Sequence, residues 1–279
     1  MNKIAICGYT SSTGKYFIKR YKNNYNFLLL GRSNPDIFVD LSIPKITGDL
    51  NLLKKCDAII NFSAQTNNTT FYDIQNMLKT NILGPLFLAN LAVENDISRF
   101  IHISSISAQY SDDNPFYSYY SQSKKYADNL LSFFCNQKKL SYCVLRPSAL
   151  FGTDDFSVHQ KLLYQIINCI KQGKDITLFG TKNSKRNYIH VETLSEIISK
   201  LIYSDVKGIY PVINMKNNSL TEIIDALNDN FNGKSKAIFD CEKPDIYPCE
   251  LYDSGQIFDL LNIPKPNGMK GELRKHIEL

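Results

Sequence analysis

Short apolar runs alternate with longer amphipathic stretches along the first 150 residues of the chain. The run AIINFS at 58–63 stays apolar until its end, which is typical of a strand buried on both faces. We expect strands at 3–7, 26–31, 37–40, 58–63, 99–104 and 141–147, and helices between them at 14–22, 49–56, 70–95 and 117–137. Strand–helix alternation of this kind predicts an α/β fold built on a doubly wound parallel sheet.

The second half of the chain is less regular. Its pattern predicts helices at 158–173, 192–203, 219–231, 254–261 and 268–277, and short strands at 176–179, 187–191 and 209–214. No internal repeat or low-complexity linker separates the two halves.

The composition is that of an ordinary soluble globular protein, with 43% apolar and 21% charged residues. The net charge of +5 is mild and no five like charges follow one another, so we expect neither a nucleic-acid partner nor a membrane-surface partner. No stretch approaches the length of a membrane span, and the apolar run near the N-terminus is too short for a signal peptide. We therefore expect a cytoplasmic protein without membrane insertion.

The cysteines and histidines give no sign of a disulfide framework or a metal centre. The seven cysteines are odd in number and scattered, and Cys7, Cys56, Cys143 and Cys169 lie in apolar segments, as small hydrophobic residues do in a reducing compartment. The four histidines show no ligand spacing, so we expect no metal.

The turn after the first strand is rich in small residues. Gly8 ends the strand, Ser11 and Gly14 follow at intervals of three, and Ser12 and Thr13 lie between them. A strand, a tight turn and a helix N-terminus together offer free backbone N–H groups to an anion such as a pyrophosphate. The spacing differs from GxGxxG, so a plain strand-to-helix turn remains the alternative.

The second strand ends in LLLGRSN, where Arg32 stands near the position at which an acidic residue would hold the hydroxyls of an NAD ribose. A guanidinium matches the geometry of a phosphate, so Arg32 favours NADP over NAD. The alternative is an exposed surface arginine, which would leave NAD as the cofactor.

Two tyrosines have a lysine four positions later, Tyr120 with Lys124 and Tyr203 with Lys207. With 17 tyrosines and 26 lysines in 279 residues, chance alone produces about 1.6 such pairs, and the spacing is an ordinary helical neighbour relation. Spacing therefore does not separate a proton-transfer pair from two polar residues on a solvated helix face.

The surrounding sequence selects the first pair, because eight segments of the chain follow one another in the same order as the motifs of a known family. They are GYTSSTG (8–14), VDLS (39–42), INFSAQT (60–66), TNILGPLFLANLA (80–92), RFIHISSISAQY (99–110), YSQSKKYAD (120–128), LRPSALFG (145–152) and RNYIHVETLSEII (186–198). Together they resemble the extended short-chain dehydrogenase/reductase family, in its branch of nucleotide-sugar epimerases, dehydratases and reductases. The chain departs from the family pattern at Ser11, Pro85, Asp128, Asn187 and at Glu192–Thr193.

The resemblance implies a Rossmann-type sheet with a small, discontinuous α/β substrate domain toward the C-terminus. The dinucleotide-binding domain would comprise 1–147 and 185–215, and the substrate domain 148–184 and 216–279. Cofactor-binding residues carried over from the motifs are Gly8, Ser11, Ser12, Thr13, Gly14, Arg32, Asp40, Leu41, Phe62, Ser63, Ala64, Asn81, Tyr120 and Lys124. A nucleotide sugar would be the partner, and a homodimer is compatible with the sequence.

The resemblance also implies a catalytic triad of Ser105, Tyr120 and Lys124, with Ser105 and Arg186 binding the substrate. Residues i and i+4 lie about 6 Å apart on a helix, so we expect Lys124 to lower the pKa of Tyr120 from its usual value of about 10. Ser105 would hydrogen-bond the substrate oxygen, and a nicotinamide would exchange hydride with the carbon that carries it.

Several functions compete. The leading hypothesis is an NADP-dependent reductase of a nucleotide-linked keto-sugar, for example a 4-keto-6-deoxyhexose, and the nearest alternative is a 4-epimerase with bound NAD. A dehydratase is disfavoured, because Ser105 is followed by Ile106 and Ser107 rather than by an acidic pair. A non-catalytic NADP-binding sensor or scaffold is the alternative from another class, and the retained Tyr120–Lys124 pair argues against it.

Overall fold

The computed structural model describes residues 2–275, and these divide into two compact units. The first unit comprises the residues up to Pro147 together with Ser195–Pro211, and the second comprises Ser148–Leu194 and the described residues from Val212 on. The helix predicted at 268–277 therefore lies partly outside the described residues.

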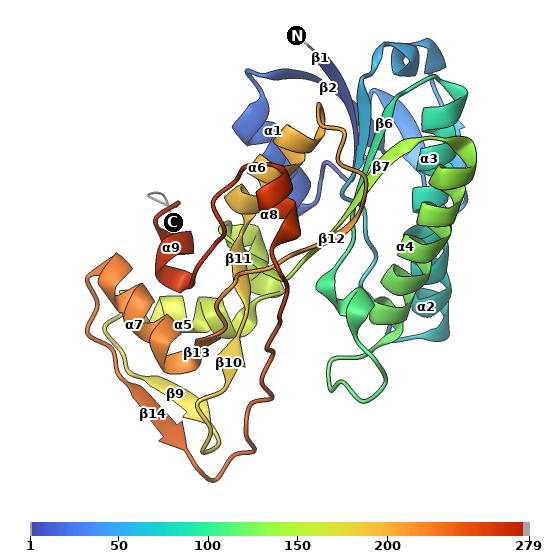
Figure 1. The fold of residues 1–279 in the computed structure, drawn as a ribbon. Coiled ribbons are helices and arrows are strands. Elements are labelled where there is room, and N and C mark those ends of the chain that lie inside the picture. Colours follow the sequence, from blue (N-terminus) through green and yellow to red (C-terminus); the bar gives the residue numbers. More distant parts are fainter. Residues whose placement is uncertain (1, 276–279) are drawn as a thin grey trace. The chain divides into compact units, whose positions relative to one another are not determined.

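The first unit is built on an eight-stranded sheet with the order β12-β7-β6-β5-β1-β2-β3-β4 (Figure 1). The strands are β1 (Asn2–Cys7), β2 (Tyr25–Gly31), β3 (Ile37–Asp40), β4 (Lys45–Thr47), β5 (Ala58–Asn61), β6 (Arg99–Ile103), β7 (Ser141–Pro147) and β12 (Gly208–Val212). Neighbouring strands pair in parallel across the sheet from β7 through β6, β5, β1 and β2 to β3. β4 pairs antiparallel to β3. The chain order reverses between β1 and β5, which makes this a Rossmann-type doubly wound sheet, as predicted.

Helices cover both faces of this sheet. α3 (Gly84–Glu94) and α4 (Tyr119–Lys138) lie on the right of the sheet in Figure 1, and α1 (Ser12–Tyr21) lies on the left. The face of the sheet that α3 covers is packed with aliphatic side chains such as Leu88. On the opposite face, the ring of Phe17 packs among the rings of Tyr25 and Phe62. All residues of β5 and β6 are buried, because both faces of these central strands are covered.

Two expected helices of the first unit differ in detail. The helix expected at 49–56 is a 3-10 helix, Leu50–Lys55, capped by Asp49. The helix expected at 70–95 consists of α2 (Phe71–Leu78), a π-helical turn at Lys79–Leu83, and α3. The π-helical turn contains the fully buried Asn81, and single π turns inside α-helices are frequent at functional sites.

The second unit contains three short strand pairs rather than one sheet. β8 (Ala149–Phe151) pairs with β11 (Tyr188–His190), β9 (Ile176–Phe179) with β14 (Ala237–Asp240), and β10 (Lys185–Arg186) with β13 (Asn218–Ser219). Its helices are α5 (Lys161–Lys171), α7 (Leu220–Phe231), α8 (Gln256–Leu260) and α9 (Met269–Leu273), with a 3-10 helix at Asp154–Val158. α6 (Val191–Leu201) begins in this unit, and the unit boundary falls within it.

The expected position of residues 185–194 differs from the structure. These residues, like 212–215, were expected in the dinucleotide-binding domain, but they group with the second unit. The reason is strand pairing, since β11 pairs with β8 and β10 pairs with β13, and none of these strands joins the central sheet.

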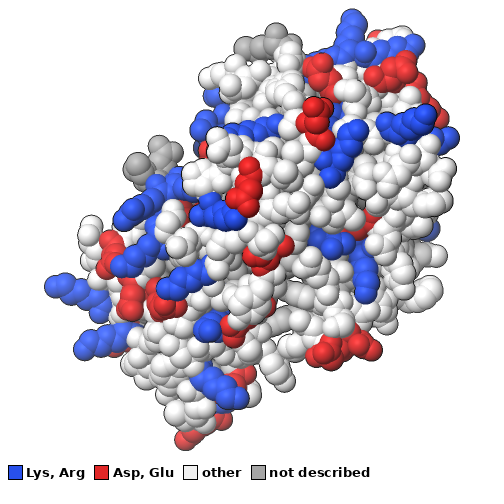
Figure 2. Space-filling model, viewed as in Figure 1, with Lys and Arg blue, Asp and Glu red and all other residues white. Residues whose placement is uncertain are grey.

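Among the described helices, none combines the length and the apolar content that a bilayer crossing requires. Figure 2 shows that basic and acidic side chains are interspersed over the face it displays. This distribution agrees with the absence of like-charge runs from the sequence.

Candidate active site

The turn between β1 and α1 is closed by the side chain of Ser11. Its Oγ donates to Gly8 O (2.7 Å) and accepts from Gly14 N (3.1 Å), and Ser11 has φ −70° as the N-cap of α1. The cap uses the N–H of Gly14, whereas the N–H groups of Ser12 and Thr13 have no acceptor within the helix. Two backbone donors at a helix N-terminus therefore remain for an anionic ligand.

Glycine is required at both ends of this turn. Gly8 has φ +81°, and a Cβ there would lie 2.5 Å from Ser63 N. A Cβ on Gly14 would lie 2.5 Å from Gly8 O. The close approach of β1, α1 and the end of β5 is possible only without these side chains, and this cradle fits the extended phosphates of a dinucleotide.

A cavity of about 470 Å³ opens beside this turn, and it lies where the strand order reverses. Seven of the expected cofactor-binding residues line it, namely Gly8, Ser11, Arg32, Asp40, Leu41, Ser63 and Ala64. The other expected residues lie outside its lining, namely Ser12, Thr13, Gly14, Phe62, Asn81, Tyr120 and Lys124.

The sequence analysis missed one wall of the cavity. Tyr72, Asn76 and Thr80 line it from α2 and the following π-helical turn. Their spacing of four residues places them on one helix face, but this spacing alone does not show that the face lines a cavity. Tyr9 also lines the cavity, and its hydroxyl donates to Ser33 O across the ends of β1 and β2.

Arg32 and Asp40 face each other at the cavity. Arg32 Nη1 lies 4.0 Å from Asp40 Oδ2, and the arginine side chain is 70% exposed. Asp40 Oδ1 accepts from Ser42 N (2.9 Å) and from Ser42 Oγ (2.7 Å). Burial raises the pKa of Asp40, but the Ser42 hydrogen bonds and the charge of Arg32 outweigh it, so the pKa is lowered overall. An exposed ion pair at this distance holds Arg32 only weakly, so its guanidinium can turn to another anion.

Asn81 ties the cavity wall to α4. Its amide oxygen accepts from Gln65 N (2.8 Å), and its Nδ2 donates to Gln65 O (2.8 Å) and to Ser123 Oγ (3.0 Å). Gln65 lines the cavity, and Ser123 Oγ donates in turn to Tyr120 O (2.8 Å). Both ends of the Asn81 amide are therefore bound to protein groups, which favours a positioning role.

The three residues expected to be catalytic come together at the end of β6 and the start of α4. Ser105 caps the 3-10 helix Ile106–Gln109, and its hydroxyl is hydrogen-bonded to the Tyr120 phenol. Ser105 Oγ also accepts from Ser107 N (3.2 Å) and from Ser107 Oγ (2.9 Å). Lys124 is fully buried, and its Nζ donates to Ile103 O (3.1 Å) and lies 5.9 Å from the centre of the Tyr120 ring.

Burial controls the ionisation of this cluster. It raises the pKa of Tyr120 to about 12, against the opposing hydrogen bond from Ser105. It lowers the pKa of Lys124 to about 8, against the opposing charge of Asp128. The expectation that the Tyr120 pKa is lowered is wrong for the protein alone, because burial of the phenol and the charge of Asp128 raise it and outweigh the Ser105 hydrogen bond.

Arg186, the expected substrate residue, belongs to the second unit. It lies in β10 and is half-buried, and its Nη1 donates to Lys185 O (2.9 Å). Burial lowers its pKa, while Tyr188 and Cys249 oppose this shift.

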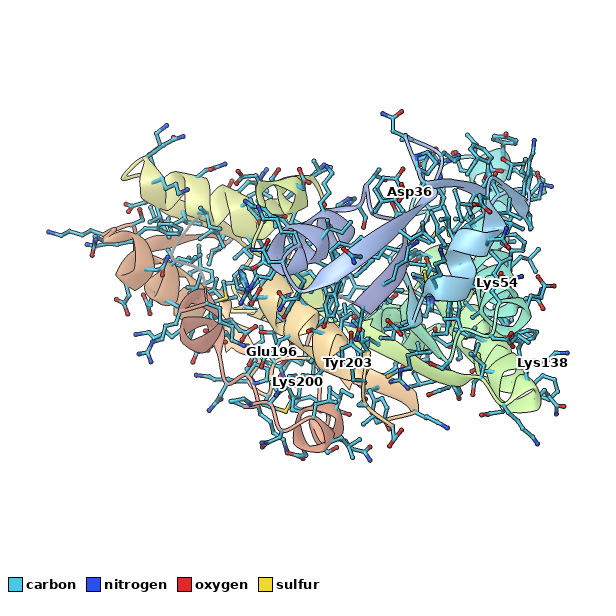
Figure 3. All side chains as sticks on the ribbon, turned by 90° about the horizontal axis from the view of Figure 1, so that it is seen from above. Asp36, Lys54, Lys138, Glu196, Lys200 and Tyr203 are labelled. Atoms are coloured by element: carbon cyan, nitrogen blue, oxygen red, sulfur yellow. The ribbon has the colours of Figure 1, made fainter. Side chains whose placement is uncertain are left out.

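The second Tyr–Lys pair has different surroundings. Tyr203, labelled in Figure 3, follows the end of α6 and is 56% exposed. Its hydroxyl accepts from Asn2 Nδ2 (2.7 Å). Tyr203 is thus a matched control for Tyr120, with the same spacing to a lysine but with an asparagine amide rather than a serine hydroxyl bound to its phenol.

Within residues 2–275, no group of three or more His, Cys, Asp and Glu side chains is arranged to hold a metal ion. Three of the four cysteines expected in apolar surroundings, Cys7, Cys56 and Cys143, are buried, and Cys169 is half-buried.

Residues 4–214 match the NAD dependent epimerase/dehydratase family. The dTDP-D-glucose 4,6-dehydratase of Dictyostelium discoideum is 24% identical over 166 residues, which cover 50% of this chain and 37% of that protein. The low-salt glycan biosynthesis protein Agl12 of Haloferax volcanii is 25% identical over 152 residues, which cover 51% of this chain and 48% of that protein. The match thus spans half or less of the length of these curated relatives.

Solved structures resemble the chain over almost its whole length. The UDP-N-acetylglucosamine 4-epimerase from Bacillus cereus has a TM-score of 0.78 at 20% identity and covers 99% of this chain and 98% of that one. A UDP-N-acetylglucosamine 4-epimerase from Methanobrevibacter ruminantium has a TM-score of 0.79 at 18% identity and covers 98% and 96%. MoeE5, in complex with UDP-glucose and NAD, has a TM-score of 0.75 at 16% identity and covers 98% and 96%. At these identities the likeness shows a shared fold.

Proposed function

Because the chain belongs to the NAD-dependent epimerase/dehydratase family, we propose that it is a nicotinamide-dependent oxidoreductase acting on a nucleotide-linked sugar. The observation that carries the proposal is that Ser105, Tyr120 and Lys124 come together at the carboxyl end of β6, in the same sheet whose strand β1 leads into the turn from Gly8 to Gly14. The turn from Gly8 to Gly14 would hold the cofactor phosphates, and Arg32 with Asp40 would hold its adenosine end. When bound, the cofactor supplies the hydride chemistry.

In the proposed reaction, Tyr120 exchanges a proton with the sugar oxygen that changes oxidation state. Ser105, hydrogen-bonded to the phenol, holds that oxygen in line with Tyr120. Lys124 places a positive charge behind the phenol and anchors the cofactor ribose. Proton transfer from a positioned side chain contributes typically about 10²–10⁴-fold to a rate.

Reduction of a keto-sugar with NADPH is the activity that the site favours. With a pKa of about 12, the Tyr120 phenol keeps its proton at neutral pH, as a proton donor must. The weakly held Arg32 guanidinium at the cavity suits a 2′-phosphate. Ile106 and Ser107 follow Ser105, and Ser107 donates back to Ser105. Neither residue offers the carboxylate expected of a dehydratase.

A 4-epimerase with bound NAD is the second candidate. The observation that favours it is the likeness, over nearly the whole chain, to two proteins described as UDP-N-acetylglucosamine 4-epimerases. Mass spectrometry of the nucleotide released from the denatured protein separates the two candidates. Retained NAD supports the epimerase, and NADP(H), or a preference for it in binding, supports the reductase.

Replacing Tyr120 tests the proposed chemistry. With a nucleotide-linked 4-keto-sugar that the native protein reduces, Tyr120→Phe should lower kcat at least about 100-fold, because the proton donor is lost. Cofactor binding, followed by NADPH fluorescence, should stay nearly unchanged. Tyr203→Phe is the control and should leave kcat unaltered. Near-native kcat in Tyr120→Phe would refute the assignment.

Replacing Arg32 tests the cofactor. Arg32→Asp should weaken NADPH binding by roughly 1–3 kcal/mol, as expected for a hydrogen bond to a charged group, and should weaken NADH binding much less. Calorimetric titration of both nucleotides measures the difference. Equal losses for the two would contradict NADP as the cofactor.

A further inference from the structure

A row of three charged residues, two fully buried and one mostly buried, runs from Lys124 along α4 to Arg146 on β7. Lys124 and Asp128 are one helical turn apart on α4, and each is 0% exposed. Arg146 reaches Asp128 from β7, with Nε 2.7 Å from Oδ2 and only 15% of its side chain exposed. The carboxylate therefore lies between two cations in the interior of the first unit.

The groups that face Lys124 come from three elements. α4 contributes Tyr120 and Asp128, β6 contributes His102, and β7 contributes Arg146 through its contact with Asp128. His102 is fully buried, and burial together with the Lys124 charge holds its pKa well below the usual value, so it stays neutral. The negative charge that offsets the buried ammonium thus comes from Asp128.

We propose that Asp128, held in place by Arg146, is a positioning residue that keeps the buried Lys124 protonated at the pH at which Tyr120 transfers its proton. This inference rests on the proposed function, since it assigns the electrostatic support of the same site. Asp128 does not line the cavity and is hydrogen-bonded to Arg146, so its charge acts on Lys124 and Tyr120 without touching the reacting atoms.

The physical need for such a residue follows from burial. Removing an ammonium group from water disfavours its charged form, and a fully buried lysine can lose its proton below neutral pH. In this protein the pKa of Lys124 falls only to about 8, because Asp128 opposes the effect of burial. The same carboxylate disfavours the phenolate of Tyr120. One acid therefore keeps the proton on both members of the pair.

Arg146 keeps Asp128 available for this role. Burial raises the pKa of Asp128, and the charge of Arg146 is the largest effect that opposes the rise. Without Arg146, the buried carboxylate and ammonium would approach a neutral acid–amine pair. The rival explanation is that Arg146 and Asp128 only fasten α4 to β7, in which case the proton affinity of Lys124 would not depend on Asp128.

Lysine ¹³Cε chemical shifts distinguish the two explanations without any substrate. The signal of Lys124 is assigned by its loss in Lys124→Met and is then titrated with pH in ¹³C-lysine-labelled protein. In Asp128→Asn the midpoint should move to lower pH by at least about one unit, because the offsetting charge is lost. Asp128→Glu, which restores the charge, should return the midpoint to within about half a unit of the native value.

A matched control and a second variant complete the titration. Asp229→Asn removes the acid of an exposed ion pair with Lys270 and should leave the Lys124 midpoint unchanged. Asp128→Ser gives the same test as Asp128→Asn if the asparagine variant does not fold, and circular dichroism checks the fold of each. An unmoved midpoint in a folded, uncharged variant would overturn the inference.

The pH dependence of kcat measures the effect of Asp128 on catalysis. In Asp128→Asn, the pH above which kcat declines should fall by the same interval as the NMR midpoint, so that acidification restores activity. Loss of kcat by the same factor at every pH would overturn the positioning role and support a structural one. The two failures are distinguishable, because the NMR titration needs no substrate, whereas failure of the proposed function would appear as normal turnover in Tyr120→Phe.

Discussion

In the first unit the buried carboxylate of Asp128 lies between two cations, whereas in the second unit the buried carboxylate of Glu272 is bound mainly by neutral donors. Glu272 Oε2 accepts from His190 N (2.6 Å) and Thr193 Oγ1 (2.9 Å), and Lys275 Nζ lies 3.3 Å from Oε1. His190 directly precedes α6, so Glu272 also lies at the positive end of that helix. These are the two buried acids among the described residues.

The different surroundings of the two carboxylates distinguish an acid that stabilises the fold from one that shifts the pKa values of its neighbours. Both oxygens of Glu272 are hydrogen-bonded, as a buried acid requires in order to hold a fold together. Asp128 Oδ1 meets no partner with hydrogen-bond geometry in the described part of the chain, although the Ser104 hydroxyl lies beside the carboxylate. A buried charge that is satisfied chiefly by other charges contributes little net stability, but it shifts the pKa values of its neighbours.

The largest effect should come from removing one partner of the charged row. Arg146→Met leaves Asp128 buried without its cation and should lower the free energy of unfolding by about 3–5 kcal/mol, measured by urea denaturation. The double variant Arg146→Met/Asp128→Leu should recover part of this loss, because the unpaired carboxylate is gone, although Lys124 stays buried without its acid. A loss below about 1 kcal/mol in the single variant would mean that Asp128 does not depend on its cation, and would remove the difference between Asp128 and Glu272.

Glu272→Ala should have the next largest effect. It removes the charged acceptor of His190 N and Thr193 Oγ1, so the free energy of unfolding should fall by about 2–3 kcal/mol in the same assay. Glu272→Gln keeps an acceptor oxygen and should lose less. In both variants kcat and its pH dependence should stay native in the folded protein. A shifted pH profile would show that the second unit also tunes the site.

The smallest effect should come from two helix caps, one in each unit. Ser11 caps α1 beside the cavity, and Ser219 caps α7. Because glycine is a tolerated N-cap, Ser11→Gly and Ser219→Gly should each lower the free energy of unfolding by only a few tenths of a kcal/mol. Cofactor affinity should change in neither variant by more than about tenfold. A larger loss confined to Ser11→Gly would show that its hydroxyl binds the cofactor phosphate.

Much of the first unit follows from local sequence. Strands such as β5 and β6 are continuous apolar runs, and the helix expected at 117–137 agrees within two residues with α4 (Tyr119–Lys138). The short strands β8, β10, β13 and β14 were not predicted. β10 and β13, of two residues each, are too short to show a period, and each of the four strands is hydrogen-bonded to a partner strand distant in sequence.

The candidate site likewise contains residues that were predicted from the sequence and residues that were not. Motif order identified Tyr120 and Lys124 on α4, and the structure places Ser105 next to them. The cavity wall formed by Tyr72 and Asn76 was not predicted, because nothing in α2 marks which face meets the turn after β1. Whether a regularly spaced face lines a cavity depends on neighbours that are distant in sequence.

The sequence by itself determined the doubly wound sheet and the glycine turn, because periodicity and turn chemistry are local properties. The order of its motifs, rather than helical spacing, selected Tyr120 and Lys124 as the candidate proton-transfer pair. Only the tertiary structure decided the direction of the pKa shifts, the pairing of Asp128 with Arg146 and the assignment of 185–194 to the second unit. These depend on burial and on contacts between segments far apart in the chain. The free energy of a charge in the interior is set by what surrounds it rather than by its neighbours in sequence.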